Sequence, residues 1–543
     1  STRWRNVYAD TLYGDGSNIT NLPAGGNTIQ LTASGSIATN KPVTLNSDGT
    51  CSEVKLETTA RTVPQLKGNG SFRNTETGGN NGCHDTTHDR IFHGYAPSGN
   101  PNDSKQCVRI WSIDSAGNQT GSTEHAPFGE YQRTYPRLRA QFIHDPDTGN
   151  VLFFYPQNYG GTGELRLLRA NTSNRNIAYS GSTNFTASVS YGSFGPVWMG
   201  GCYDTANNKS IVSWVHEVDS YDLRCRVISL SGTDENATIT MGTDTLISNG
   251  NHRCSDLVYD PDTGKVILVY CRYDSSVFKA FSRVGTVSGN SISWSSEITI
   301  DSNDCFATQV TYDTTNNKLV CCYYRSSYLR TRVGTVSGNS ISWGSETQVS
   351  QSTVSTSTGT GWSNGYKEGS GIAYDDQTDT IAYCYNEGTS IQFRYGYING
   401  STITMRGNKT DPGCNNTWGM CLFQLIGYDS FFCAFRHQGN NRGYYNIMDT
   451  AVVNCNMDNS NKYLGFVESA VSNGQTATIL TYGNTTSNLS GLTAGQHYYV
   501  QGNGTLGTSV DTSYFSSSRN EPVAGLALSS SKLLINNFMP NHS

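Results

Sequence analysis

The sequence is poor in charge and contains no long apolar run. Of its 543 residues, 15% are Asp, Glu, Lys or Arg, well below the roughly 25% typical of globular proteins. No stretch of 18 apolar residues is present, which argues against a membrane-spanning helix. The first residues, STRWRNVYAD, show neither the basic nor the apolar region of an export signal. We therefore expect synthesis in the cytoplasm and no membrane insertion.

The sequence also lacks the charge pattern of a nucleic-acid-binding protein. Its formal net charge is −6 at pH 7, and its Lys and Arg residues do not cluster as phosphate binding requires. The 15 cysteines form no CxxC pair and mostly lie in apolar runs such as KLVCCYY. We interpret them as reduced, buried thiols. The sequence does not decide whether a few disulfides form, for example between Cys83 and Cys107, because spacing alone cannot establish them.

Catalytic motifs are missing as well. The sequence contains no P-loop, EF-hand or sialidase-type SxDxGxxW box. A glycosidase needs two facing carboxylates. The pairs Glu217 with Asp219 and Glu368 with Asp375 can be named, but no pattern supports them. We therefore predict a protein that is not an enzyme and has no cofactor, with glycan degradation as an alternative.

One histidine-rich segment, CHDTTHDRIFHGY, invites a metal interpretation. It contains His84, Asp85, His88, Asp89 and His93. An HxxxH spacing suits zinc when it lies on a helix, but this segment precedes an expected strand and lacks the Glu of HExxH. We therefore expect hydrogen bonding at a sheet edge and no metal site.

The residues that the sequence does have in excess favour strands and turns. There are 57 Gly and 32 Tyr beside many Ser, Thr and Asn. The string RVGTVSGNSISW occurs twice, at 283–294 and at 332–343. Around both copies runs a common hairpin of two apolar runs joined by an Asp-rich turn, as in YDPDTGKVILVY and YDTTNNKLVCCYY. Taking the turn Asp as the anchor gives seven units, anchored at Asp89, Asp145, Asp204, Asp260, Asp313, Asp375 and Asp429.

Each unit reads as four short strands. Seven such units predict an all-β fold with a seven-bladed β-propeller over residues 61–459. A linear β-solenoid is the alternative, although its repeats are usually shorter. The duplicated string is then the third strand, the turn and the start of the fourth strand of two adjacent blades.

Related strand-and-turn phrases bracket the repeats. VTLNSDGT precedes them and YYVQGNGTLG follows them, and neither flank alone can bury a core. Because a closed ring brings its first and last blades together, we predict that residues 27–60 and 460–543 form one split small β-domain that carries the propeller as an insert. Extended residues near Val54 to Val63 are candidates for a strand that completes a blade.

Several phrases resemble a known family. WRNVYADTLYGDGSNITNL, ASGSIATNKPVTLNSDGT and SGLTAGQHYYVQGNGTLGT look like phrases in structural appendage and fibre proteins of tailed phages, especially marine phages that infect cyanobacteria. The resemblance implies a virion protein displayed on the particle surface and assembled as a homo-oligomer, often a trimer. It also implies that residues 1–26 form an attachment or oligomerisation segment, which would contact other virion proteins together with the split domain.

Propeller geometry predicts which face recognises a partner. The first-to-second and third-to-fourth turns lie on one face and read as tight, whereas the second-to-third loops and the connections between blades lie on the other face and are long and varied. Variable loops on a fixed frame usually carry recognition. Aromatic rings beside amide and guanidinium donors suit saccharides. We therefore predict a fibre-type, receptor-binding protein for host-surface glycan. A capsid or tail decoration protein is the alternative, in which these residues cap blade edges or meet neighbouring subunits. The candidate residues are Tyr159, Tyr221, Tyr273, Arg325, Tyr328, Trp362, Tyr366, Lys367, Arg436 and Arg442.

Overall fold

The structure is a computed structural model of the chain. It describes residues 28–73, 76–98, 106–128, 140–156, 163–186, 196–216, 220–354, 370–387, 390–413, 417–437, 442–457, 462–515 and 522–536. The regular elements in these ranges are β-strands, so the predicted all-β class is confirmed. Within the same ranges, no helix has the length and apolar character needed to cross a membrane.

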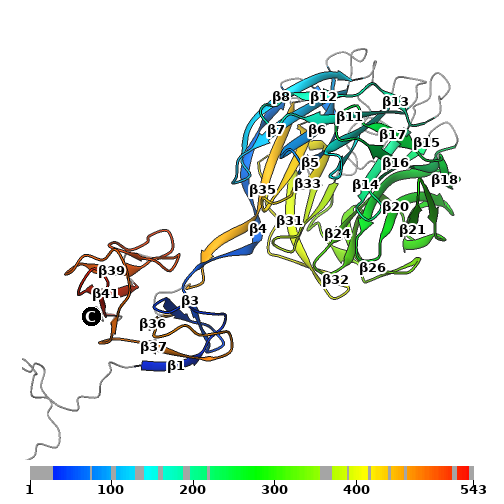
Figure 1. Cartoon of the computed structure of the whole chain (residues 1–543). Coiled ribbons are helices and arrows are strands. Elements are labelled where there is room, and N and C mark those ends of the chain that lie inside the picture. Colours follow the sequence, from blue (N-terminus) through cyan, green and yellow to red (C-terminus); the bar gives the residue numbers. More distant parts are fainter. Residues whose placement is uncertain are drawn as a thin grey trace, which may run out of the picture. The chain divides into compact units, whose positions relative to one another are not determined.

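The chain forms two compact units (Figure 1). Unit 1 comprises residues 1–59 and 452–543, and unit 2 comprises residues 60–451. The second boundary lies inside strand β35 (Gly443–Cys455), whereas the sequence analysis placed it after residue 459. The boundary lies earlier because the last residues of β35, 452–455, belong to unit 1.

Unit 1 contains a sheet built from both ends of the chain, with strand order β1-β37-β36-β2-β3. Thr28 lies opposite Leu480, and Pro42 lies opposite Phe466. A second sheet has the order β38-β42-β41-β39-β40. The strands of the first sheet are β1 (Thr28–Thr32), β2 (Pro42–Leu45), β3 (Cys51–Glu53), β36 (Tyr463–Val467) and β37 (Thr476–Leu480). Those of the second are β38 (Thr485–Thr486), β39 (His497–Val500), β40 (Leu506–Gly507), β41 (Val523–Ala527) and β42 (Leu533–Ile535).

Unit 2 contains seven antiparallel sheets among the described residues, numbered here 1 to 7 along the chain. Sheet 1 is β5 (Glu76–Asp85), β6 (Arg90–Ser98), β7 (Gln106–Ile113) and β8 (Gln119–Phe128). Sheet 2 is β9 (Gln141–Asp145), β10 (Asn150–Pro156), β11 (Gly163–Ala170), β12 (Ile177–Tyr179) and β13 (Thr183–Asn184). Sheet 3 is β14 (Pro196–Asp204), β15 (Lys209–His216), β16 (Asp222–Ser231), β17 (Thr238–Met241) and β18 (Thr245–Ser248).

The remaining sheets repeat this plan. Sheet 4 is β19 (His252–Asp260), β20 (Lys265–Asp274), β21 (Val277–Ser288), β22 (Ser291–Trp294) and β23 (Ile298–Asp301). Sheet 5 is β24 (Cys305–Asp313), β25 (Lys318–Arg325), β26 (Tyr328–Ser337), β27 (Ser340–Trp343) and β28 (Thr347–Gln348). Sheet 6 is β29 (Ser370–Asp375), β30 (Thr380–Glu387), β31 (Ser390–Asn399) and β32 (Thr402–Met405). Sheet 7 is β33 (Thr417–Leu425), β34 (Ser430–His437), β35 and β4 (Leu56–Arg73).

The seven sheets pack in a closed circular order, which makes unit 2 propeller-like. The first strand of each sheet contacts the first strand of the next, and β33 of sheet 7 contacts β5 of sheet 1. Every neighbouring pair of sheets shares one buried apolar cluster, including the pair formed by sheets 7 and 1. The inner strands lie so close that a Cβ on Gly200 would stand 2.8 Å from the Cα of Asp256. Burial on both faces explains why the second strands β10 and β30 are buried at every residue.

Strand β4 completes sheet 7 from the far end of the sequence. It pairs with β35 as the fourth strand of that sheet, and it overlaps the extended stretch near Val54 to Val63. The Arg61 guanidinium bonds to Asp449 at 2.8 Å, and Phe72, only 7% exposed, packs into the cluster between sheets 7 and 1. The ring of sheets is therefore closed by residues that precede the first repeat.

The register of the repeats differs from the prediction at both ends. In sheets 2 to 6 the anchor Asp ends the first strand, as expected. In sheet 1 that place belongs to Asp85 instead of Asp89, and in sheet 7 it belongs to Leu425. Asp89 and Asp429 instead occupy the last turn position, with φ of 55° and 44°, a left-handed conformation that Asp adopts more readily than most residues. The anchors Asp89 and Asp429 were therefore wrong.

Candidate functional site

One end of the sheets carries seven turns of one design. Each connection between the first and second strands is four residues long. In sheets 1 to 6 the Asp that ends the first strand caps the turn, as where Asp145 Oδ1 accepts the N–H groups of Asp147 and Thr148 at 3.0 and 3.1 Å. The last turn residue has a positive φ in all seven sheets, at Asp89, Gly149, Asn208, Gly264, Asn317, Asp379 and Asp429.

These turns are bonded across the boundaries between sheets. In sheet 6, the Tyr374 hydroxyl donates to Thr315 Oγ1 in the turn of sheet 5 at 2.7 Å. In sheet 7, Gln424 Nε2 donates to Asp375 Oδ1 at the turn of sheet 6 at 3.0 Å. The residue just before the anchor position thus reaches back to the preceding turn. This turn face is organised to hold the sheets together.

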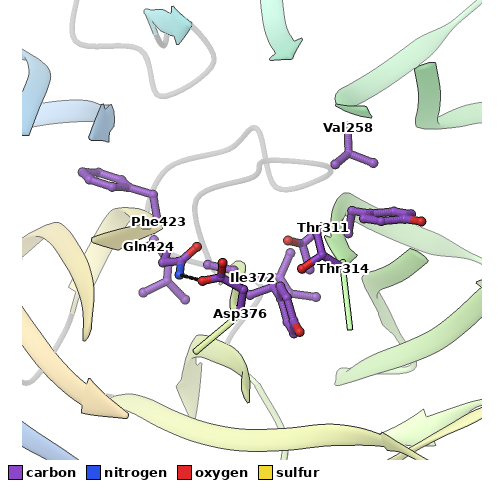
Figure 2. Close-up of a pocket in the computed structure, with 11 residues that line it drawn as sticks. Val258, Thr311, Thr314, Ile372, Asp376, Phe423 and Gln424 are labelled. Atoms are coloured by element: carbon purple, nitrogen blue, oxygen red, sulfur yellow. Dashed lines mark hydrogen bonds between the residues drawn. The ribbon is translucent and has the colours of Figure 1, made fainter. Parts of the chain in front are cut away.

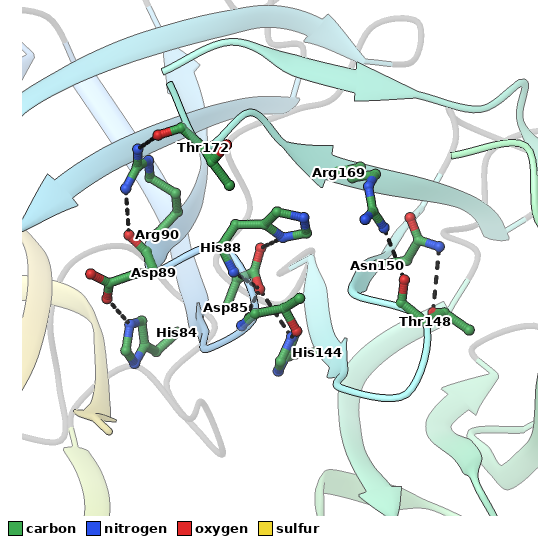
Figure 3. Close-up of polar contacts among 11 residues, drawn as sticks. His84, Asp85, His88, Asp89, Arg90, His144, Thr148, Asn150, Arg169 and Thr172 are labelled. Carbon is green, nitrogen blue, oxygen red and sulfur yellow. Dashed lines mark hydrogen bonds and ion pairs between the residues drawn. The ribbon is translucent and has the colours of Figure 1, made fainter. Parts of the chain in front are cut away.

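The histidine-rich segment lies on the turn face and forms part of this bonding (Figure 3). Asp85 contacts His88 Nδ1 at 2.8 Å and His144 Nε2, from sheet 2, at 3.0 Å. Burial alone would raise the pKa of Asp85, but the hydrogen bond from His144 and the two imidazoles hold it below its ordinary value. Burial lowers the pKa of His84, whose Nδ1 accepts the N–H of Ile426 at 3.0 Å.

The geometry of this segment is that of a hydrogen-bonded cluster. His84 Nε2 lies 3.2 Å from Asp89 Oδ1, and His93 Nε2 lies 3.0 Å from Asn80 Oδ1 in the interior. In the described part of the chain, no group of three His, Cys, Asp or Glu side chains is placed to hold a metal ion. His84, Asp85, His88 and Asp89 are therefore bonded to one another and to sheets 2 and 7, and His93 is bonded to Asn80.

A cavity of about 340 Å³ opens at the inner strands of sheets 4 to 7 (Figure 2). Its wall is largely apolar. Among its lining residues there is a single carboxylate, Asp376, and Gln424 Nε2 donates to it at 2.9 Å. A glycosidase site needs two facing carboxylates, so this lining does not provide one. The lining residues are Val258, Thr311, Tyr312, Thr314, Ile372, Ala373, Tyr374, Asp376, Leu422, Phe423 and Gln424.

The opposite ends of the sheets carry the second-to-third connections, which differ in length from two to seven residues. We call this the loop face. Of the ten predicted binding residues, Tyr159, Trp362, Tyr366 and Lys367 lie outside the described residues. The same holds for the carboxylates Glu217, Asp219 and Glu368, whereas Asp375 caps a turn and accepts the Thr378 hydroxyl at 2.7 Å.

Three predicted residues are engaged within the fold. Arg325 forms ion pairs with Asp301 at 3.1 Å and with Glu346 at 2.7 Å. Tyr328 begins β26, and the Arg330 guanidinium lies 5.3 Å from its ring centroid. Arg436 is only 8% exposed. Their side chains therefore stabilise sheets 5 and 7.

Two further candidates, Tyr221 and Arg442, lie in connections of the loop face. Tyr221 has a φ of 64°, its carbonyl accepts the N–H of His252 at 3.2 Å, and its ring lies 6.3 Å from that of Trp198. Arg442 is exposed, and its carbonyl accepts the N–H of His437 at 2.9 Å. Neither residue lines the cavity described above.

Among the predicted aromatic residues that the structure describes, Tyr273 is the most exposed, at 48%. Its ring lies 5.2 Å from that of Phe278, and the neighbouring Asp274 and Lys279 form an ion pair at 3.0 Å. The sequence analysis did not name Phe278, Asp274 or Lys279. They lie in RYDSSVFKAFS, before the first copy of the duplicated string, which differs from YRSSYLRT before the second copy, and variable loops of this kind were predicted to carry recognition.

A repeated arginine was also missed. Arg283 Nε donates to the Tyr270 hydroxyl at 3.1 Å, and its Nη1 donates to the Ser295 carbonyl at 2.9 Å. Arg332 makes the same bonds to Tyr323 and Gly344, at 2.9 and 3.0 Å. Each Arg joins the second, third and fourth strands of its sheet. Both are the first residue of the duplicated string, so that string is a structural part of the sheet.

The cysteines in the described ranges are all thiols, 14 in number. Cys83 and Cys107, the pair for which a disulfide stayed open, are not joined. Burial raises the pKa of Cys107 to about 12 and also raises that of Cys83. These thiols therefore stay protonated at neutral pH.

No family model matches the chain, and no curated protein matches it. Among solved structures, the chain is similar to the polysaccharide lyase Uly1, with 8% identity over 66% of this chain and 88% of that chain and a TM-score of 0.41. It is similar to the Dos1 propeller, with 11% identity over 75% and 81% and a TM-score of 0.38. It is also similar to AofleA from Arthrobotrys oligospora, with 9% identity over 67% and 91% and a TM-score of 0.40. At TM-scores this low, the likenesses carry no argument about fold or function.

Proposed function

We propose that this protein is a surface appendage of a tailed-phage virion that attaches to a host-surface glycan. Unit 2 is then a seven-bladed β-propeller inserted into a split β-domain, unit 1. The observation that carries the proposal is the contrast between the first-to-second turns and the second-to-third connections. All seven first-to-second turns are four residues long, whereas the second-to-third connections on the loop face vary from two to seven residues. The third-to-fourth turns, at the same end as the first-to-second turns, were predicted to be tight, but their lengths vary from two to six residues. Variable loops on a fixed frame usually carry recognition.

The seven blades and the split domain are supported by contacts within each unit. Each neighbouring pair of sheets shares one apolar cluster, and β4 supplies the last strand of sheet 7. In unit 1, three strands from the N-terminal flank join two strands from the C-terminal flank in one sheet. Each flank thus depends on the other, as an insertion between them requires.

The virion assignment rests on the phrases at 4–22, 33–50 and 490–508, which resemble phage appendage proteins. The same resemblance supports a homo-oligomer, with a trimer as the expected state, attached through residues 1–26 and unit 1. A decoration protein of the capsid or tail is the alternative position on the particle. Glycan degradation is less well supported, because the central cavity offers one lining carboxylate where hydrolysis needs two.

The test is a phage whose copy of this protein lacks residues 60–451, with residues 59 and 452 joined by a short Gly-Ser linker. We expect normal particle assembly and loss of adsorption to the host. Normal adsorption would contradict the attachment role. Release of oligosaccharides from host envelope polysaccharide by the purified protein would contradict the non-enzymatic part of the proposal.

A further inference from the structure

Sheets 4 and 5 share the duplicated string but differ in one hairpin of the loop face. In sheet 5, Arg325 pairs with Tyr328 just before the turn formed by Ser326 and Ser327. In sheet 4, the equivalent pair is Arg272 with Lys279. Two more pairs follow it, Tyr273 with Phe278 and Asp274 with Val277, before the turn at 275–276. The hairpin of sheet 4 therefore extends two residue pairs further than its closest counterpart.

The added pairs create a fixed aromatic surface. Tyr273 is 48% exposed, and its ring lies 5.2 Å from that of Phe278, which is 7% exposed. Phe278 is held in turn by Phe306, with ring centroids 6.3 Å apart, and by the Arg253 guanidinium, 4.1 Å from the ring centroid. The Tyr273 N–H donates to the Asn251 carbonyl at 2.9 Å. The exposed ring thus stands on a packed base, which lowers the entropic cost of using it for binding.

The polar side chains of the hairpin lie on the face opposite this ring, because successive residues of a strand point to opposite faces, and they balance one another in charge. Lys279 Nζ donates to Asp274 Oδ2 at 3.0 Å, and Ser275 Oγ donates to Asp274 Oδ1 at 3.0 Å. The hydrogen bond from Lys279, followed by that from Ser275, lowers the pKa of Asp274. Arg272 is paired with Glu297 at 2.7 Å. Arg272 and Lys279 therefore have anionic partners, and the two added pairs bring only the carboxylate of Asp274, which is paired with Lys279, so the added surface suits a neutral ligand.

We propose that the hairpin of sheet 4 is a stacking site for a neutral pyranose sugar. Tyr273 supplies the face on which the C–H side of the sugar packs. This inference rests on the proposed glycan attachment and names the residues and the class of sugar. Sheet 5 has a Tyr at 328 where sheet 4 has Lys279, and it lacks the two added pairs, so it serves as a natural control.

The test measures binding of the full chain to an array of immobilised neutral glucans, galactans and mannans together with acidic uronate polymers. In a shortened variant, Tyr273, Asp274, Val277 and Phe278 are removed to reproduce the hairpin of sheet 5. We expect the wild type to bind a neutral saccharide, and both the shortened variant and Tyr273→Ala to bind it roughly tenfold more weakly. Tyr273→Phe keeps the ring and should keep most of the affinity. Tyr179→Ala, which removes a tyrosine that is 54% exposed on sheet 2, should not change binding.

The outcomes separate this inference from the proposed function. Binding of a neutral saccharide that is unchanged in both hairpin variants would overturn the site and leave glycan attachment standing. Binding of acidic polymers alone would overturn the sugar class. No binding to any saccharide would remove the attachment proposal and this site with it. Hairpin variants that lose self-association in sedimentation, with saccharide binding unchanged, would assign the surface to contact between copies. If the shortened variant does not fold, Tyr273→Ala decides the question.

Discussion

His144 Nε2 lies 3.0 Å from Asp85 Oδ1, so the first strand of sheet 2 is bonded to the turn of sheet 1. Between sheets 5 and 6 the corresponding contact is made by the Tyr374 hydroxyl with Thr315, at 2.7 Å. A histidine and a tyrosine thus fill one role at equivalent positions. The turn face requires a polar side chain of sufficient reach at this point and tolerates different chemistry in providing it.

Removing a turn-capping carboxylate should destabilise unit 2. In Asp145→Ala, the N–H groups of Asp147 and Thr148 lose their acceptor, which should lower the free energy of unfolding by roughly 1–3 kcal/mol. Asp147→Ala changes an exposed carboxylate in the same turn and should have little effect. Thermal unfolding of the two variants against the wild type measures the difference. Equal midpoints for the two variants would refute the capping role.

Acid should lower the free energy of unfolding because His93 is buried in its neutral form. This side chain is fully buried, and burial, followed by the charge of Arg109, lowers its pKa to about 3. An unfolded chain binds a proton there near pH 6.5, so the native state lacks that proton between about pH 6.5 and 3. The contribution of the neutral His93 to the free energy of unfolding is therefore complete above about pH 6.5. Below that pH the free energy of unfolding falls by up to roughly 1.4 kcal/mol per pH unit.

The variant that tests this prediction gives His93 and Asn80 the residues that occupy the equivalent positions in sheets 2 and 3. Phe153 lies opposite Arg166 as His93 lies opposite Arg109, and Met199 holds the bulge position of Asn80 in sheet 3. His93→Phe with Asn80→Met should therefore fold and show a shallower loss of stability from pH 7.5 to 4.5 in urea unfolding. An unchanged pH dependence would show that another group is responsible.

Arg325→Ala should affect stability and leave saccharide binding intact. Burial raises the pKa of Asp301, but the bonds from Asn303 and Tyr323 and the charge of Arg325 together hold it below its ordinary value. The stabilisation from such a carboxylate is present above about pH 4 and is lost as the pH falls through its native pKa. We expect a loss of roughly 1–3 kcal/mol at pH 7, with the gap to the wild type narrowing below about pH 4. Arg442→Ala, an exposed arginine of the loop face, is the control for unfolding at pH 7 and 3.5.

Strand β4 should be required for a stable ring of sheets. A fragment of residues 56–455 contains every strand of unit 2, whereas residues 76–455 lack β4 and with it the Arg61–Asp449 ion pair and Phe72. We expect the longer fragment to unfold in one sharp calorimetric transition. The shorter one should melt at a lower temperature and self-associate on gel filtration, because the edge of β35 is exposed. Equal melting and elution would contradict the closing role of β4.

The sequence predicted the all-β class and the hairpins of sheets 2 to 6 because their turns share one pattern and one length. In the first and last units, sheets 1 and 7, the sequence analysis placed the anchor at the wrong residue. HDTTHDR contains two His-Asp pairs, and only its alignment with YDTTNNK identifies Asp85 as the residue that ends the strand. In sheet 7 the capping Asp is replaced by Leu425, so the turn residue Asp429 was the nearest carboxylate.

The binding face was harder to predict because side-chain pairing depends on register. Arg325 looks like a free donor in the sequence, yet Asp301 and Glu346 engage it from neighbouring positions in the fold. Tyr273 is exposed only because two added pairs extend its hairpin. The duplicated string is explained by Arg283 and Arg332, which tie three strands of each sheet together.

The most direct measurement of the central claim is an electron cryo-microscopy map of intact particles that carry this protein. The proposed function predicts density for unit 2 at the outer end of an appendage, with the loop face and Tyr273 directed away from the particle. Density within the capsid shell, with the loop face covered by neighbouring subunits, would contradict attachment and favour a decoration protein.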